Sequence, residues 1–158
     1  MSRKILLIAM CLATGAWISN SYEAGESAAG DDDKELQKFQ GSWVMVGGER
    51  DGKKVADEDV KRSKMVYKGK IIEVMTPHQS SETVVADIVQ IDPTKTPKQM
   101  RFIRRNGPSA GIEITGIYEF EGPDRYKFAF DPAGKTVPKA FVTKEGSGQI
   151  AHTWKRQK

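Results

Sequence analysis

The chain has 158 residues, of which 38% are hydrophobic and 29% charged, and its formal net charge is +4. This length suits one domain, and the composition excludes a disordered or fibrous chain. The single cysteine, Cys11, lies in an N-terminal apolar run. A chain that has lost this run contains no thiol, which excludes a disulfide framework, a thiolate metal site and a cysteine nucleophile.

The N-terminus has the order of features that is typical of a secretory signal peptide. Arg3 and Lys4 precede the uncharged apolar stretch 5–18, and small residues follow it. The stretch is shorter than the roughly 20 residues that a membrane-spanning helix needs, so an uncleaved anchor is the less favoured alternative. We therefore predict a signal peptide over residues 1–21 and an exported protein, either periplasmic or secreted.

The rest of the chain begins with a predicted flexible leader over the small and acidic residues 22–33. Asp33 is expected to cap one or two helical turns, which Gly41 ends. Another short helical turn is expected over residues 57–62. Strands are expected over residues 42–49, 64–67, 71–75, 83–91, 99–105, 112–120 and 125–130, with a short edge piece over 138–142 and a last strand over 149–156.

About eight short strands separated by turn residues are typical of a β-sandwich or an up-and-down barrel. A barrel leaves no exposed strand edge, so we predict an all-β domain over residues 34–158, an eight-stranded antiparallel barrel with a short N-terminal helical turn. Gly116 inside a strand predicts a bend or close packing, with Trp43 as the expected neighbour. Alternation along the strands predicts these inward side chains: Trp43, Met45, Met65, Tyr67, Ile72, Val74, Met100, Phe102, Ile114, Tyr118, Phe120, Tyr126, Phe128, Phe130 and Trp154.

The segment Gly41-Ser42-Trp43, which opens the first strand, resembles the Gly-x-Trp signature of lipocalins. In lipocalins this Trp packs at the closed end of the barrel under a basic residue near the last strand, so the resemblance implies that Lys155 or Arg156 stacks on Trp43.

Residues 33–158 as a whole are similar to a lipocalin-like family of small exported bacterial domains, abundant in planctomycetes and without established function. The resemblance implies a lipocalin-like barrel and an exported location, and it implies no catalytic residues. It rests on the following segments: Leu36-Gln37-x-x-Gln40-Gly41-Ser42-Trp43, Glu49-Arg50-Asp51-Gly52-Lys53-Lys54, Asp92-Pro93-Thr94-Lys95-x-Pro97-Lys98, Gly116-Ile117-Tyr118-Glu119 and Gly146-Ser147-Gly148.

Two loops match catalytic motifs by their letters alone. Residues 107–111 fit the G-x-S-x-G pattern of serine hydrolases, but a predicted strand follows them where that mechanism needs a helix. Residues 129–136 fit a relaxed phosphate-loop pattern, but Pro132 removes a backbone amide and Pro138 prevents the helix that would bind phosphate. We therefore predict a Gly/Pro turn and a hairpin loop.

The two histidines and a cluster of arginines are the remaining polar candidates. No metal-binding spacing joins His78 to His152. We expect His78 to be a solvated turn residue and His152 to be a histidine of the barrel wall beside Trp154. Residues 101–105 interleave three arginines with Phe and Ile, which predicts a solvated strand face, with weak binding to an anionic surface as the alternative.

These observations predict an exported, non-catalytic barrel that binds a small apolar or amphipathic molecule, with no cofactor or metal, as a monomer without a nucleic-acid partner. The alternative is a filled barrel that acts as a structural or protein-interaction module with an exported partner. A small hydrolase or isomerase that uses His152 with carboxylates is a third hypothesis. The candidate ligand-binding residues are Trp43, Met45, Tyr67, Met100, Phe102, Tyr118, Phe120, Tyr126, Phe128 and His152.

Overall fold

The computed structural model describes residues 29–158. The predicted signal peptide (1–21) and the first part of the predicted leader (22–28) lie outside the described residues. Within 29–158, no helix combines the length and the apolar character that crossing a membrane requires.

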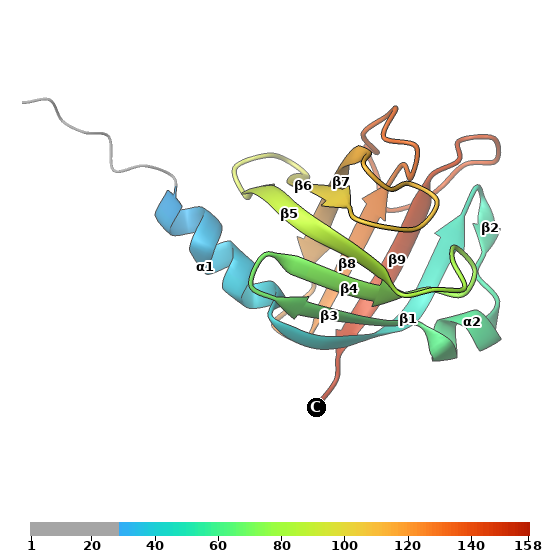
Figure 1. Cartoon of the computed structure of the whole chain (residues 1–158), viewed down its shortest axis with the longest axis horizontal. Coiled ribbons are helices and arrows are strands. Elements are labelled where there is room, and N and C mark those ends of the chain that lie inside the picture. The colour runs from blue at the N-terminus through green and yellow to red at the C-terminus, as the bar shows by residue number, and fades with distance from the viewer. Residues whose placement is uncertain (1–28) are drawn as a thin grey trace, which may run out of the picture.

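Eight antiparallel strands close into a barrel, which confirms the predicted fold class (Figure 1). Strands β3 to β9 pair in chain order, and the pairing of β1 with β9 closes the ring from Trp43 opposite Arg156 to Arg50 opposite Ile150. The two-residue strand β2 (Lys53–Lys54) pairs only with the end of β1. The barrel strands are β1 (Gly41–Arg50), β3 (Lys64–Lys68), β4 (Ile71–Met75), β5 (Val84–Asp92), β6 (Lys98–Arg104), β7 (Glu113–Phe120), β8 (Arg125–Phe130) and β9 (Ile150–Arg156).

A helix, α1 (Ala29–Phe39), closes one end of the barrel (Figure 1). It begins four residues before the expected cap Asp33 and includes residues 29–33 of the predicted leader. The acidic side chains of this segment lie in the first turn of the helix, where the helix dipole favours negative charge. Its last residue, Phe39, is fully buried, and its ring centre lies 4.8 to 5.2 Å from the ring centres of four aromatic residues: Tyr67, Tyr118, Phe120 and Tyr126.

A buried ion network also ties α1 to the barrel. The Glu35 carboxylate is 3% exposed and accepts hydrogen bonds from Lys38 at 2.6 Å and from Lys98 of β6 at 2.7 Å. Burial acts to raise the pKa of Glu35, but the bonds and charges of the two lysines hold it below its ordinary value. The Tyr118 hydroxyl donates a third bond to the same carboxylate at 3.2 Å.

The expected stacking of a basic residue on Trp43 is confirmed, with Arg156 as that residue. Its guanidinium carbon lies 4.2 Å from the Trp43 ring centre, and Arg156 donates hydrogen bonds to the carbonyls of Gln40 at 2.6 Å and Lys38 at 2.9 Å. The Trp43 indole donates to the Phe39 carbonyl at 2.6 Å. These contacts join the helix, the first strand and the last strand at the closed end.

The prediction of the inward faces is confirmed for all fifteen residues. Thirteen are buried in one apolar cluster, and Val74 and Phe120 are partly buried against it. Gly116 is closely packed as expected, but against a different ring: a Cβ there would lie 2.5 Å from Cζ of Phe128 on the next strand, not near Trp43.

The expectation of an edge piece over residues 138–142 is wrong. These residues belong to the long loop between β8 and β9 and form no strand. The loop packs Phe141 against an apolar patch on the outside of the barrel, made by Ile117 and two alanines, and Thr143 donates its backbone amide to Glu49 at 3.0 Å. The segment is therefore attached to the barrel by the packing of Phe141 and by the bond at Thr143, without strand pairing. The short helix predicted over 57–62 is confirmed as α2 (Asp57–Arg62).

Candidate functional site

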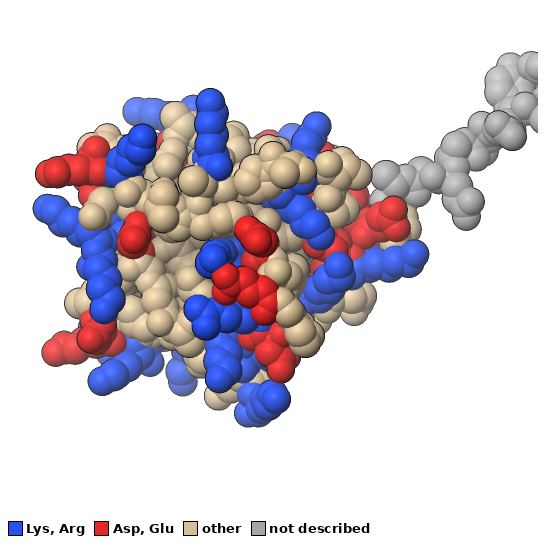
Figure 2. All heavy atoms as spheres, turned by 180° about the vertical axis from the view of Figure 1, so that it is seen from behind, with Lys and Arg blue, Asp and Glu red and all other residues tan. Residues whose placement is uncertain are grey.

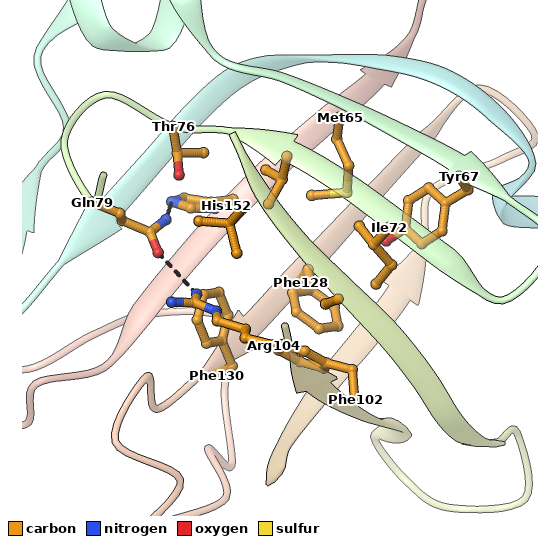
Figure 3. A pocket seen from close by; sticks show the side chains of 13 residues that line it. Met65, Tyr67, Ile72, Thr76, Gln79, Phe102, Arg104, Phe128, Phe130 and His152 are labelled. Atoms are coloured by element: carbon orange, nitrogen blue, oxygen red, sulfur yellow. Dashed lines mark hydrogen bonds between the residues drawn. The ribbon is translucent and has the colours of Figure 1, made fainter. Parts of the chain in front are cut away.

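A small pocket enters the barrel at the end opposite α1, where β4, β6 and β8 finish and β5 and β9 begin (Figure 3). We call it the far-end pocket. Its volume is about 40 Å³, which is room for a few water molecules, whereas pockets for drug-sized ligands usually measure some 300–1,000 Å³. Four polar residues line it (Thr76, Gln79, Arg104 and His152) together with nine mostly apolar ones: Met65, Tyr67, Ile72, Val74, Val84, Ala86, Phe102, Phe128 and Phe130.

Four of the ten candidate ligand-binding residues line this pocket: Tyr67, Phe102, Phe128 and His152. The other six do not. Trp43, Met45, Met100, Tyr118 and Tyr126 are buried in the packed interior, and Phe120 is partly buried near α1.

The hydroxyls of the three candidate tyrosines already bond within the protein. The hydroxyls of Tyr67 and Tyr126 lie 3.1 Å apart and share a hydrogen bond, and Tyr118 donates to Glu35. The polar groups of the far-end pocket that are free of such tyrosine bonds therefore belong to other residues.

The only two histidines of the chain meet beside the pocket, 74 positions apart in sequence. Their Nε2 atoms lie 3.0 Å apart, with the rings nearly perpendicular, and the Gln79 amide nitrogen is 3.5 Å from each. The expectation that His78 is solvated is wrong, because the turn after β4 folds it against the barrel wall, where it is half-buried. His152 is 3% exposed and lies on the same side of β9 as Trp154, as predicted.

The surroundings of both imidazoles lower their pKa values and so favour the neutral form. Burial lowers the pKa of His152 well below its ordinary value of 6.5, and the positive charge of Arg104 and the nearby His78 lower it further. Burial also lowers the pKa of His78. Since two imidazolium ions in contact would repel each other, one neutral ring donates its Nε2–H to the other.

The prediction for Arg104 is also wrong. This residue was assigned to a solvated basic face with Arg101 and Arg105, yet it is 6% exposed and lines the far-end pocket. Its guanidinium donates to Oε1 of Gln79 at 3.3 Å and lies 5.4 Å from the centre of the Phe130 ring (Figure 3). Within residues 29–158, no carboxylate comes within salt-bridge distance of it, and burial lowers its pKa.

The other two arginines do lie on the outside. Arg101 pairs with Glu113 at 3.0 Å, and Arg105 pairs with Asp87 at 2.6 Å. Figure 2 shows the same mixture over one whole face, where Lys and Arg are interspersed with Asp and Glu. Along β6, therefore, the arginine that lies in the interior is the one without an acidic partner.

The two motif-like loops have structural roles, as predicted. The Ser109 hydroxyl donates to the Pro132 carbonyl at 2.7 Å. Asp131 accepts from the amides of Ala133 and Thr136, both at 2.9 Å, which fixes the start of the loop after β8. Neither loop precedes a helix in the described residues.

The described part of the chain offers little support for hydrolytic or metal chemistry. No carboxylate there hydrogen-bonds to His152, whose polar neighbours are His78 and Gln79. Residues 29–158 also contain no group of three or more His, Cys, Asp and Glu side chains placed to hold a metal ion.

No family model, curated protein or solved structure matches the chain.

Proposed function

We propose that this protein is an exported, lipocalin-like barrel that binds a small amphipathic molecule in the far-end pocket without transforming it. One observation carries the proposal: the pocket combines an apolar wall with a buried cationic side chain, Arg104, that has no carboxylate partner in the described residues. Binding pockets are mostly apolar with a few polar groups that orient the ligand. Charged side chains are almost never buried in an apolar wall without a partner, so packing alone does not explain an arginine at this position.

The small volume of the pocket limits the size of the ligand. About 40 Å³ admits only a compact group unless side chains at the entrance move. Gln79 lies in the turn between β4 and β5, and movement of this single side chain enlarges the entrance. We therefore propose a ligand of a few heavy atoms, or a small end group of a larger molecule.

The filled-barrel alternative is favoured by the same volume. A barrel whose interior is packed down to this remnant acts through its outer surface, as a structural or protein-interaction module. The two functions predict different companions for the protein purified from its host: a bound small molecule in one case, and no ligand or a partner protein in the other.

Native mass spectrometry of the protein purified from its host tests the choice. We expect the chain to carry a small-molecule adduct that Ala86→Leu loses, because Ala86 is buried in the pocket wall and the larger side chain fills the space. Val89→Leu is the matched control, since Val89 lies exposed on the same strand. A bare chain, or one bound only to another protein, would favour the filled-barrel module. The same spectrum gives the mature mass, and a chain that retains residues 1–18 would contradict signal-peptide cleavage.

A further inference from the structure

We propose that the far-end pocket recognises a monocarboxylate, whose two oxygens bind the Arg104 guanidinium where Gln79 Oε1 now lies. This inference rests on the proposed binding function and specifies the chemical class of the ligand: a short aliphatic or aromatic acid, or the acid end of a longer one.

Arg104 makes fewer hydrogen bonds than the other buried charged side chains of the described residues. Three aspartate, glutamate or arginine side chains are buried in the described residues. Glu35 receives two lysines, and Asp131 receives two backbone amides and a hydroxyl. Arg104 has one long hydrogen bond, from Nη2 to a neutral amide oxygen, and an aromatic face. A buried cation without an anion is costly, so the missing partner is the feature that a ligand would supply.

The other polar groups of the pocket suit an anion as well. No aspartate or glutamate lines it. The Thr76 hydroxyl can donate a hydrogen bond to a ligand oxygen. This donor adds a hydrogen bond to a carboxylate held by arginine, whereas the positive charge of Arg104 would repel an ammonium group.

Gln79 occupies the position that a ligand oxygen would take. Its Oε1 accepts from Arg104 at 3.3 Å, while its amide nitrogen faces the two imidazoles at 3.5 Å. All three contacts are long for hydrogen bonds, so a charged oxygen can displace them. Because Gln79 lies in a turn and is only half-buried, its side chain can leave toward solvent.

The single positive charge and the apolar wall select a monocarboxylate over a phosphate. One guanidinium neutralises one negative charge, and a dianion would leave a second charge among the rings of Phe102, Phe128 and Phe130. The planar fork of arginine also matches the planar carboxylate with two parallel bonds. The same rings accept the hydrocarbon part of the acid.

Nuclear magnetic resonance titrations with butyrate, 1-butanol and butylamine at pH 7 test the inference on the full chain. These probes share a chain length and differ in head-group charge. We expect butyrate to shift the signals of pocket residues with a dissociation constant about tenfold or more below that of 1-butanol, because its hydrogen bonds are charge-assisted. Butylamine should bind no better than 1-butanol.

Three variants test the role of Arg104. Arg104→Met should weaken butyrate binding by about tenfold or more and change 1-butanol binding by less than about threefold. Arg101→Met removes an outward arginine from the same strand and should change neither. Gln79→Ala removes the competing oxygen and should tighten butyrate binding, which provides a second test if Arg104→Met does not fold.

The outcomes separate the two proposals. Equal binding of butyrate and 1-butanol, or preference for butylamine, would overturn the anion inference and leave the binding function standing. If none of the three probes shifts a pocket signal at concentrations of about 10 mM, both proposals fail.

Discussion

Arg104→Met distinguishes a side chain kept for a ligand from one that the fold needs. The variant loses a 3.3 Å hydrogen bond to a neutral amide, worth about 1 kcal/mol, and a cation–π contact at 5.4 Å with Phe130, worth about 0.5–1 kcal/mol. It also removes the desolvation penalty of an unneutralised buried charge, which is several kcal/mol. Met keeps an unbranched apolar stem in the same space. The ligand-free protein should therefore gain about 1–3 kcal/mol, or roughly 3–10 °C in Tm.

Thermal unfolding followed by circular dichroism, at pH 7 in a buffer free of organic acids, measures this change. Arg101→Met is the control, because its exposed pair with Glu113 is worth at most about 1 kcal/mol. Butyrate should raise the Tm of the wild-type protein and leave that of Arg104→Met unchanged. A Tm for Arg104→Met several degrees below wild type would show that the guanidinium supports the fold, and the argument from its missing partner would fail.

Three further predictions concern pH, packing and the closed end. The free energy of unfolding should fall as the pH drops from 7.5 to 5.5. The reason is that the pKa values of His152 and His78 in the folded protein lie below 6.5, so the unfolded chain takes up protons that the folded chain excludes. A Tm that stays constant over this range would contradict the buried neutral pair. Gly116→Ala should cost about 1–3 kcal/mol in urea denaturation, since its Cβ would meet a phenylalanine ring at 2.5 Å, whereas Gly47→Ala, with nothing within 4 Å, should cost less than half as much. Arg156→Ala should cost about 2–3 kcal/mol by the same assay, because it removes a cation–π contact and two bonds to backbone carbonyls; a loss below about 0.5 kcal/mol would mean that these contacts do not hold the closed end.

Local patterns predicted the barrel well because strand residues alternate between two faces. The period of two along β7, for example, places Ile114 and Tyr118 inside without any knowledge of the neighbouring strands. The loop over 138–142 was predicted less well, because a short apolar segment resembles a strand whether or not a partner strand is within reach.

The site was predicted only in part, and its misses have different causes. Arg104 could have been found, since it follows Met100 and Phe102 at a spacing of two along β6; its charge led to the assumption of a solvated side chain. His78 offered no comparable signal. It lies in a turn, and only the path of that turn brings it to His152 on the last strand.

Strand content and the direction of most side chains follow from short-range order in the chain, because a residue's face depends on its immediate neighbours. The contact between Arg156 and Trp43 was implied by the resemblance to lipocalins, and it depends on the pairing of the first strand with the last. The far-end pocket depends instead on how eight strands close, since its lining residues come from β3 at one end of the series and β9 at the other. Its volume is what remains after the interior side chains pack together. The meeting of Gln79, Arg104 and His152 is likewise set by the register of distant strands, which no local pattern records.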